Sequence, residues 1–395
     1  MTTVSWTPPT HTATHPTTTH HTTNPPPHSE RPKALVIGAG VSGWTTALVL
    51  AQRHWDVTVV ADRVGSATVS TVAGAVWEWP PSVCGRHHDE TILTRTKNWA
   101  LRSYGRFAQL AADPRTGVRL RPGVFYFTQP VKELPDEFAK MAEVEENVPG
   151  FVHDAGLIDA HGINRDTGVV DAYSYLAPTI DTDQYLTWLA RQAQLAGVRF
   201  VRAYIDGPLT EQQQQLFDDY GAEIVVNCAG LGASGLAADL SMDPHRGALI
   251  RMVNDGTSMP RVTAVHAMAN DTSTDEQNMI FIVPRGRDRL LLGGLVEAGE
   301  YGVELTLGNY PPLQNIIDRC TEFLPALRGA RLDPVDPVRA GLRPFRHGGV
   351  RLETEPETRI VHNYGHGGAG VTLSWGCAHE AAELASAILS PCGVT

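Results

Sequence analysis

The sequence predicts an α/β protein with a nucleotide-binding domain and a second lobe built on a mixed or antiparallel sheet. The folded part opens at residues 33–63 with the pattern strand, glycine-rich turn, helix, strand. Residues 185–203 and 222–230 continue this alternation of helix and buried strand. By contrast, residues 247–253 and 279–295 predict closely spaced strands and a hairpin, as in a sheet-based lobe.

Composition limits both the size and the function of the protein. With 395 residues the chain is long enough for two domains. The net charge of −11 and the lack of a long Lys/Arg cluster disfavour binding to nucleic acids or to anionic membranes. No run of about 18 apolar residues occurs, so no membrane span is expected.

The cysteines and the N-terminal residues bear on the compartment. The cysteines show neither a CxxC pair nor a Cys/His zinc pattern, and they predict reduced thiols in a cytoplasmic protein. They are Cys84, Cys228, Cys320, Cys377 and Cys392.

Residues 1–32 are dominated by Thr, Pro and His and lack the apolar core of a signal peptide. A disordered tail is expected there, although its histidines could chelate a stray metal ion.

Three glycines at the GxGxxG spacing follow the first predicted strand. Gly38 permits the tight turn, Gly40 lets a pyrophosphate approach the main chain, and Gly43 lets the next helix pack close to the sheet. Val41 and Ser42 begin that helix. Its free N–H groups and the positive end of its dipole would hold the phosphates.

An acidic residue closes the second predicted strand. Asp62 lies 19 residues after Gly43, where a carboxylate can accept hydrogen bonds from ribose hydroxyls. Between two strands and with this acid, the motif predicts dinucleotide binding by a Rossmann-like unit. The alternative is a merely structural glycine-rich turn. The motif does not choose between NAD and FAD.

Four further stretches indicate the cofactor by resemblance. They are ADRVGSATVSTVAGAVW (61–77), VNCAGLGA (226–233), RAGLRPFRHGGVRLE (339–353) and IVHNYGHGGAGVTLSWGCAHEAAEL (360–384). Together with the opening GAGVSG, and in this order, they closely resemble the D-amino-acid oxidase family of FAD enzymes, which includes the D-aspartate oxidases. The resemblance covers roughly residues 33–392, and the HNYGHGGAGxT and GxRPxR blocks are its most specific parts.

The resemblance implies an FAD-binding domain assembled from separate segments and a substrate domain built on an antiparallel sheet. The FAD-binding domain is expected to comprise residues 33–85, 170–235 and 335–392. The substrate domain is expected to comprise residues 86–169 and 236–334. A homodimer is compatible with this organisation.

The implied FAD contacts come from the opening motif, the four stretches and one residue between them. They are Gly38, Gly40, Val41, Ser42, Gly43, Asp62, Arg63, Thr68, Ser70, Gly74, Ala75, Trp77, Ile205, Cys228, Gly230, Arg343, Gly367, Gly368, Gly370, Val371 and Thr372. No metal is implied. His87 and His88 stand beside acidic residues, but adjacent histidines in a polar loop are more often solvated than metal-bound.

The block HNYGHGGAGVTLSWG at 362–376 contains five glycines in fifteen residues. If residues 362–368 lie against the flavin ring, only residues without Cβ let main-chain atoms reach its edge. The helix expected at about 371–389 would then point its N-terminus at the N1–C2=O region and favour the negative charge of the reduced flavin. The alternative is a loop rich in glycine for tight packing only.

The implied reaction is the oxidative deamination of a D-amino acid. The Cα hydrogen leaves as hydride to flavin N5, molecular oxygen becomes hydrogen peroxide, and the imino acid hydrolyses to a keto acid and ammonia. Arg343 of the GxRPxR block would grip the substrate carboxylate, and the main-chain carbonyl of Gly368 would receive the amine. The alternative for Arg343 is a domain-bridging ion pair. Arg346 and Arg351 are expected in ordinary salt links or in solvent.

Two positions of the implied substrate site depart from the family pattern. The family usually has a tyrosine whose hydroxyl helps to hold the carboxylate, and Phe281 stands in its place. A second tyrosine, on an active-site lid, aligns with Gln277. The loss of one hydrogen bond to a carboxylate costs about 1.5–3 kcal/mol, which weakens substrate binding without preventing hydride transfer. Tyr301 or Tyr310 could compensate.

Glu78 is a third departure, because the family more often has a neutral residue there. If it faces the substrate, its carboxylate would repel D-Asp or D-Glu and attract a cationic side chain. If it pairs with Arg86 or Arg121, it is structural. The neighbouring Trp77 and Trp79 are either walls of the substrate site or core aromatics.

Two functions follow from these residues. The first is an FAD-dependent oxidase of D-amino acids, whose partners are an amino-acid-like small molecule and molecular oxygen. The second is a flavin amine oxidase or dehydrogenase of the same fold that acts on a specialised amine-bearing biosynthetic intermediate. Phe281, Gln277 and Glu78 motivate the second. A non-catalytic flavin-binding regulator would leave Arg343 without a role.

Overall fold

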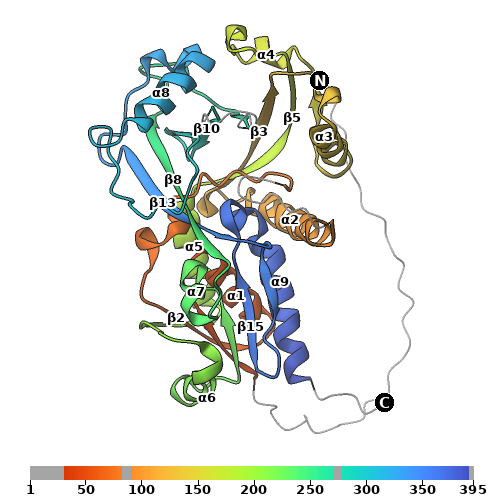
Figure 1. Ribbon diagram of the computed structural model, residues 1–395, viewed down its shortest axis with the longest axis vertical. Helices are drawn as coiled ribbons and strands as arrows, with labels where there is room; N and C mark the ends of the chain where they lie inside the picture. The colour runs from red at the N-terminus through yellow and green to blue at the C-terminus, as the bar shows by residue number, and fades with distance from the viewer. Residues whose placement is uncertain (1–30, 82–89, 270–277, 391–395) are drawn as a thin grey trace, which may run out of the picture. The chain divides into compact units, whose positions relative to one another are not determined.

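A computed structural model describes residues 31–81, 90–269 and 278–390 (Figure 1). The chain divides into two units, Met1–Arg31 and Pro32–Thr395. All that follows concerns the second unit, which contains two β-sheets.

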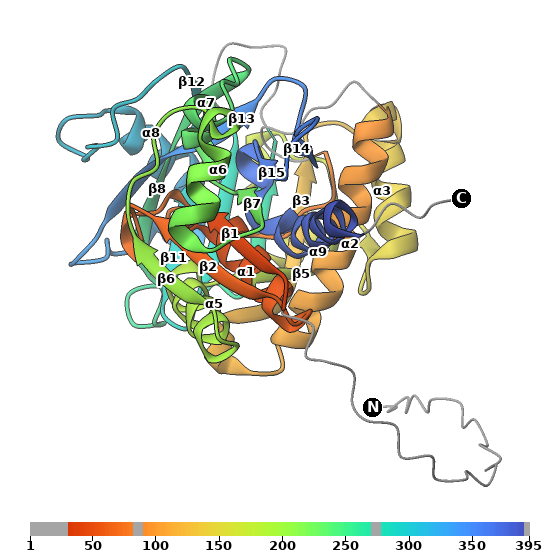
Figure 2. The same cartoon turned by 90° about the horizontal axis from the view of Figure 1, so that it is seen from below.

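The first sheet has six strands in the order β14-β15-β7-β1-β2-β6, which lie side by side in Figure 2. Its strands are β1 (Lys33–Ile37), β2 (Asp56–Ala61), β6 (Arg199–Arg202), β7 (Ile224–Asn227), β14 (Arg351–Thr354) and β15 (Ile360–Tyr364). Every pairing is parallel except that of β14 with β15. This is the Rossmann-like arrangement that the opening pattern predicts.

Helices cover both faces of this sheet. They are α1 (Val41–Gln52), α5 (Thr182–Leu195) and α9 (Gly370–Leu389) on one face and α6 (Leu209–Tyr220) on the other. Successive residues of β1 alternate between the two cores, as strand geometry requires: Val36 packs with α1 and α9, and Ile37 packs on the side of α6.

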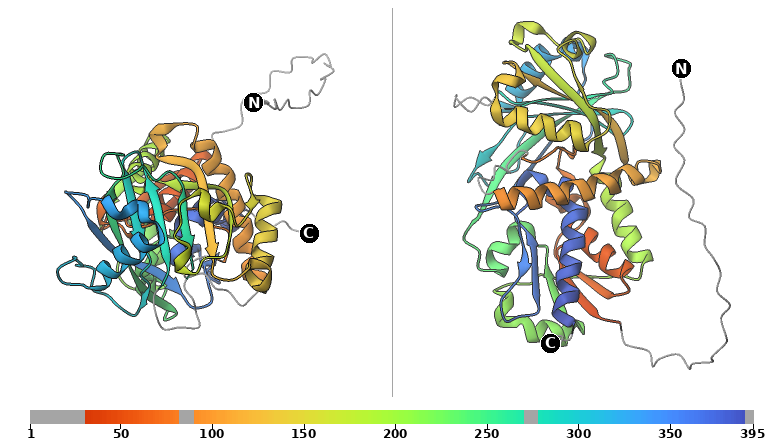
Figure 3. Two further views of the ribbon diagram at one scale, coloured as in Figure 1. Left: turned by 90° about the horizontal axis from the view of Figure 1, so that it is seen from above. Right: turned by 90° about the vertical axis from the view of Figure 1, so that its right-hand side faces the viewer.

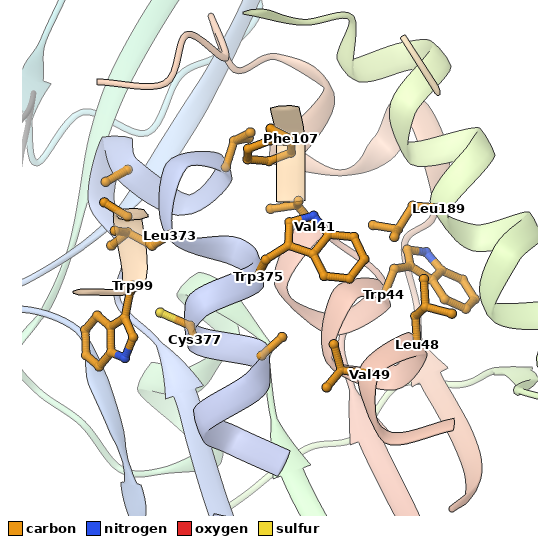
Figure 4. Packing of buried hydrophobic residues seen from close by; sticks show 14 of the residues in the cluster. Val41, Trp44, Leu48, Val49, Trp99, Phe107, Leu189, Leu373, Trp375 and Cys377 are labelled. Carbon is orange, nitrogen blue, oxygen red and sulfur yellow. The ribbon is translucent and has the colours of Figure 1, made fainter. Parts of the chain in front are cut away.

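Helix α9 packs along α1 and is crossed by α2 (Glu90–Leu110). Figure 4 shows Trp44 and Leu48 of α1 close to Trp375 of α9, whose indole N–H donates to Tyr185 Oη at 2.9 Å. Where α2 crosses α9, a Cβ on Gly376 would lie 2.3 Å from backbone atoms of Trp99. The glycine therefore permits the close helix contact. Helix α2 also contacts the second sheet and lies between the two sheets in Figure 3.

The second sheet has nine strands in the order β12-β8-β11-β10-β9-β3-β5-β4, with β13 paired to β8. Its strands are β3 (Val118–Phe127), β4 (Val152–His153), β5 (Asp171–Ile180), β8 (Met242–Val253), β9 (Val265–Met268), β10 (Ile280–Arg285), β11 (Arg289–Gly293), β12 (Glu297–Ala298) and β13 (Val338–Arg346). Only the β3–β9 pairing is parallel. One face packs on α8 (Pro312–Phe323) and the short α4 (Leu157–Ala160). Helix α3 (Pro135–Asn147) lies at the β4–β5 end, and α7 (Ala233–Leu236) follows β7.

The predicted strands and helices are found, but the two sheets do not follow the predicted domain boundaries. Strands β5 and β13 fall in segments expected in the FAD-binding domain, yet both pair within the nine-stranded sheet. Helix α2 falls in a segment expected in the substrate domain, yet it packs on α9. Both differences arise because these elements connect the two sheets.

In the part of the chain that the structure describes, no helix is long and apolar enough to cross a bilayer, and no cluster of potential metal ligands is found. Cys228, Cys320 and Cys377 are buried free thiols. Cys84, Cys392, His87 and His88 lie outside the described residues.

Candidate active site

The expected cofactor residues gather at the carboxyl edge of the six-stranded sheet. Gly38 follows β1, Asp62 follows β2, Cys228 follows β7 and Gly367 lies beyond β15, and these four strands are parallel. Ile205 lies just beyond the fifth parallel strand, β6. In open α/β sheets this edge is where nucleotides bind.

Each glycine of the first turn lies where a side chain would meet neighbouring atoms. Gly38 has φ +110°, and a Cβ there would lie 2.5 Å from the carbonyl oxygen of Cys228. A Cβ on Gly43 would lie 1.9 Å from the carbonyl oxygen of Gly38, and one on Gly40 would lie 3.0 Å from Ser70 Oγ. The turn is therefore a close backbone-to-backbone crossing that larger residues would open.

The N-terminus of α1 is suited to an anion. Gly40 is its N-cap residue and supplies no side-chain cap, and the first turn contains no acidic residue. The Val41 N–H donates to Ser70 Oγ at 3.0 Å, which joins the segment after β2 to the helix start. Asp62 directly follows β2, and its side chain is 48% exposed beside Arg63. The expected ribose acceptor is thus accessible.

The C-terminal glycine block forms the second part of the cradle. Between β15 and α9 the chain turns at Gly365 (φ +82°) and Gly367 (φ +54°). Gly368 is exposed, whereas residues 360–367 are buried, so its main chain is accessible. The first turn of α9 carries neither an acidic residue nor a side-chain cap.

Two buried polar atoms in this block have no hydrogen-bond partner, Asn363 Oδ1 and His366 Nε2. Burial lowers the pKa of His366 to about 4, so its ring is neutral. Orphaned buried polar atoms next to two uncapped helix starts and two glycine turns fit a missing polar group such as a dinucleotide. The residues present therefore fit FAD.

The segment after Ser70, called here the flavin loop (residues 71–77), joins the two sheets. Ala75 has φ +52°, and Val76 bridges Thr179 of β5. The buried Arg285 of β10 donates to the carbonyl oxygens of Ala73 (2.6 Å) and Gly74 (3.0 Å). Burial lowers the pKa of Arg285 to about 10, which leaves it charged at neutral pH. Arg285 was not predicted, because no local pattern links it to this loop.

Arg343 lies on the face of the nine-stranded sheet that packs against the flavin loop. It pairs with His245 across β13 and β8. Its guanidinium lies over Gly247, where a Cβ would be 2.3–2.5 Å from guanidinium atoms, and its Nη1 donates to the carbonyl oxygen of Arg246 at 3.1 Å. The absence of a side chain on Gly247 therefore allows this position of Arg343.

Phe281 lies on the same face of the sheet as Arg343, with its ring wedged between two glycines. A Cβ on Gly74 would lie 2.3 Å from the ring, and one on Gly293 would lie 3.1 Å from it. Gln277 lies outside the described residues. Tyr301 is 69% exposed, and the hydroxyl of Tyr310 donates to Glu297. These positions thus give neither tyrosine the compensating role.

Glu78 has a partner that the sequence analysis did not predict. Lys140 of α3 donates to Glu78 Oε1 at 2.9 Å and to the carbonyl oxygen of Pro81 at 3.1 Å. The expected pairing with Arg121 is wrong, because Arg121 donates to the main-chain carbonyls of Gly286 and Thr263. The other expected partner, Arg86, lies outside the described residues.

The two tryptophans beside Glu78 are core residues. The Trp77 indole is fully buried, donates to the carbonyl oxygen of Ala100 at 3.0 Å and packs edge-on against Tyr104. Trp79 donates to Glu143 at 2.8 Å. The expected lining of the flavin ring by the Trp77 side chain is therefore not supported. The side chain of Cys228 is also turned inward, with Sγ 3.7 Å from Thr46 Oγ1.

A charged network ties the two most specific sequence blocks together. The buried carboxylate of Asp239 accepts from Arg346 Nε at 2.7 Å and from the Tyr364 hydroxyl at 2.8 Å. Burial alone would raise the pKa of Asp239, but these two partners hold it well below its usual range. Arg351 donates to the same Tyr364 hydroxyl at 3.0 Å. Arg346 and Arg351 therefore form the expected salt links, whereas Asp239 was missed.

The fold and the site together define a flavin-dependent oxidoreductase: a Rossmann-like sheet with a dinucleotide cradle, joined to a second sheet that presents an arginine beside it. The family of FAD-dependent oxidoreductases designated DAO matches residues 33–384, and the chain belongs to this family.

Similar proteins of known name cover nearly the whole chain. The D-amino-acid oxidase of Rubrobacter xylanophilus is 37% identical over 91% of this chain and 97% of its own length. The D-amino-acid oxidase of Streptomyces coelicolor is 36% identical over 90% and 97%. The crystal structure of glycine oxidase from Geobacillus kaustophilus matches with a TM-score of 0.71 at 18% identity, over 90% of this chain and 94% of that chain, and shows the same fold.

Proposed function

We propose that the protein oxidises D-amino acids to imino acids. The observation that carries the proposal is the place of Arg343, which lies on the sheet face that packs against the flavin loop and also carries Phe281. A planar guanidinium there can bind an α-carboxylate through two parallel hydrogen bonds. The relatives from R. xylanophilus and S. coelicolor, both named D-amino-acid oxidase, support the same reaction.

The chain's own residues bind and orient the substrate. Arg343 would fix the carboxylate, and the exposed main chain of Gly368 would accept the amine from the opposite side, which sets the direction of the Cα–H bond. Bound FAD supplies the hydride acceptor. No side chain has to act as an acid or base if the amine arrives neutral, so positioning is the main task of these residues.

The environment of Phe281 is consistent with modest substrate affinity. Its ring fills the space between Gly74 and Gly293 and offers no hydrogen bond to a carboxylate. Binding then depends on Arg343 more heavily than in a site with an additional hydroxyl. Molecular oxygen as the electron acceptor, hydrogen peroxide as a product, a cytoplasmic location and a homodimer are further parts of this proposal.

The proposal is tested by a peroxide assay over D- and L-amino acids with the purified yellow protein. D-amino acids should give peroxide and L-amino acids should not. Arg343→Ala should retain the flavin spectrum and lose activity, whereas Arg343→Lys, which keeps the charge but not the planar fork, should recover only a small part of it. Peroxide from L-amino acids alone, or an unimpaired Arg343→Ala variant, would contradict the proposal.

The second candidate is an amine oxidase or dehydrogenase of the same fold that acts on a specialised intermediate. The observation that favours it is Phe281, because a site without the additional hydroxyl is less selective for substrates with a free α-carboxylate. Flavin bleaching under anaerobic conditions without oxygen consumption in air would indicate a dehydrogenase. Lack of turnover with every simple D-amino acid, together with turnover of larger amines, would indicate the specialised substrate.

A further inference from the structure

A row of directly paired residues crosses the face of the nine-stranded sheet that carries Arg343. Phe281 pairs with Ala267, Ala267 with Phe125, and Phe125 with Tyr173. Directly paired residues point to the same side of a sheet, so these four side chains form one wall. The rings of Phe125 and Tyr173 are stacked, with centroids 5.4 Å apart.

Ala267 is the only small side chain in this wall. It is half-buried between Phe281 and Phe125, so the wall has its lowest point there. A substrate held through its carboxylate at Arg343 would extend its side chain over Ala267 toward Phe125 and Tyr173, which are 8% and 1% exposed and continue the wall to the pair beyond. Neighbouring strands lie about 4.8 Å apart, which puts Tyr173 about 10 Å from Ala267. A long amino-acid side chain covers most of this distance.

The wall ends at the ion pair of Glu78 and Lys140. Trp77, which directly precedes Glu78, packs edge-on against Tyr175 with ring centroids 6.1 Å apart, and Tyr175 stacks on Tyr173 at 6.3 Å, so the pair adjoins this end of the wall. Burial raises the pKa of Tyr173, and the Lys140 ammonium opposes this shift. The Lys140 side chain is 10% exposed and that of Glu78 is 24% exposed, so the carboxylate is the more accessible partner. Burial would lower the pKa of Lys140, but the charge and hydrogen bond of Glu78, together with Tyr173 and Glu137, outweigh it, and Lys140 stays charged.

The Glu78–Lys140 pair is also connected to the flavin loop. Glu78 directly follows this loop, in which Gly74 touches the Phe281 ring and Val76 packs with Phe281 and Leu249. Ala75, with φ +52°, interrupts the extended chain, but beyond it Val76 bridges β5, and Val76 and Glu78 are spaced by two, as in an extended chain whose alternate side chains share one side. The loop and the wall therefore converge on the same pair from two directions.

We infer that Lys140 determines the side-chain specificity of the enzyme by neutralising Glu78 at the end of this wall. The inference rests on the proposed function, since it concerns the side chain of a D-amino acid held at Arg343. With both partners present the wall ends in a pair without net charge and accepts neutral side chains. Removal of one partner leaves a single charge beside apolar rings, where water screens it weakly.

Two single substitutions should therefore shift the specificity in opposite directions. Lys140→Met exposes the carboxylate, and the ratio of kcat/KM for D-Arg to that for D-Met should rise about tenfold. Glu78→Gln exposes the ammonium, and the ratio of kcat/KM for D-Glu to that for D-Gln should rise about tenfold. The negative charge of Glu137, which also acts on Lys140, reduces this rise. The double variant should return both ratios to within about threefold of the original values.

A ratio of two substrates on one preparation does not change when part of the protein is misfolded, so a merely structural pair would leave both ratios constant. Lys97→Met is the matched control, because it removes the lysine from another Lys–Glu pair. Lys97 lies 2.7 Å from Glu143, and Glu143 is one turn from Lys140 on α3. Lys140→Gln, which keeps a hydrogen bond to Glu78, replaces Lys140→Met if that variant does not fold. Unchanged ratios in both single variants would overturn the inference, whereas an original protein inactive on every D-amino acid would instead overturn the proposed function.

Discussion

In the proposed site, the main chain predominates at the carboxyl edge of the six-stranded sheet, whereas side chains predominate on the face of the nine-stranded sheet. The first region consists of glycine turns and two helix starts without side-chain caps. The second consists of Arg343, Phe281 and the Glu78–Lys140 pair. Backbone N–H groups can hold phosphates of any nucleotide, but only side chains can distinguish one amino acid from another.

Glycines occur in both regions but for different reasons. In the first turn Gly43 makes room for another backbone segment, the carbonyl of Gly38. In the second sheet Gly247 makes room for a side chain, the guanidinium of Arg343. A substitution in the first region should therefore affect cofactor binding, and one in the second should affect substrate binding.

Gly43→Ala is expected to have the largest effect. Its Cβ would lie 1.9 Å from the Gly38 carbonyl oxygen, so the turn must open and the helix start must move away from the phosphates. The purified variant should contain little or no flavin, which its absorption spectrum will show. Gly105→Ala is the control, because a Cβ on Gly105 meets nothing within 4 Å; it should bind FAD normally and gain about 1 kcal/mol in stability. A fully yellow Gly43→Ala protein would show that this turn does not hold the cofactor.

Gly247→Ala is expected to reduce kcat/KM about a hundredfold while the flavin remains bound, because a displacement of about 1 Å at the binding group has an effect of that size. The added Cβ would occupy the position of the Arg343 guanidinium, so that KM should change most. In an Arg343→Ala background the same substitution should have no further effect. Additive effects would mean that Gly247 acts on something other than Arg343. Gly302→Ala serves as the control, since its Cβ would lie 3.5 Å from the nearest atom.

The same contrast explains which features could be predicted from the sequence. The turn glycines, β1, β2 and α9 were predicted because their signals are local: residue spacing, alternation and the lack of Cβ atoms. Lys140, Asp239 and Arg285 could not be predicted in this way. Their partners Glu78, Tyr364 and Gly74 lie 62, 125 and 211 positions away along the chain. Only the folded arrangement brings such pairs together.

The extents of the two sheets differ from the expected domain boundaries for a related reason. Strand β13 carries the GxRPxR block, which the resemblance associates with FAD, but its backbone pairs along its whole length with β8 of the other sheet. Membership of a sheet depends on which strand lies alongside, and a single sequence does not reveal this for distant segments. The block therefore contributes to both regions. Its strand β13 belongs to the nine-stranded sheet, and its Arg346 is linked through Asp239 to Tyr364 of the six-stranded sheet.

Asp239→Asn tests this link between the two regions. The amide cannot balance the charge of Arg346, which is also close to Gly365 of the glycine block. Removal of one partner from a buried pair should lower the free energy of unfolding by about 3 kcal/mol, and kcat/KM should fall about tenfold with FAD retained. Chemical denaturation and steady-state kinetics measure the two effects. The control is Asp113→Asn, because its ion pair with Arg115 is exposed and distant in the sequence from both blocks; it should change neither quantity. An Asp239→Asn variant with unchanged kinetics would mean that the network stabilises the protein without positioning Arg343.

The smallest expected effect concerns the opposite face of the nine-stranded sheet and should leave activity at neutral pH unchanged. Burial lowers the pKa of His266 to about 3, and its Nδ1 lies 2.9 Å from the Tyr126 hydroxyl. Because the folded-state pKa lies below the unfolded value of about 6.5, the unfolded chain binds the proton first, and stability falls as the pH drops below that value. Between pH 7 and 5.5 His266 should reduce the free energy of unfolding by about 1 kcal/mol. His266→Gln, which can keep a hydrogen bond to Tyr126, should show a shallower loss of stability over this range in denaturation experiments. Since burial also lowers the pKa of His161, His362, His366 and His379, a variant with the same pH slope as the original protein would assign the acid sensitivity to one of those histidines instead.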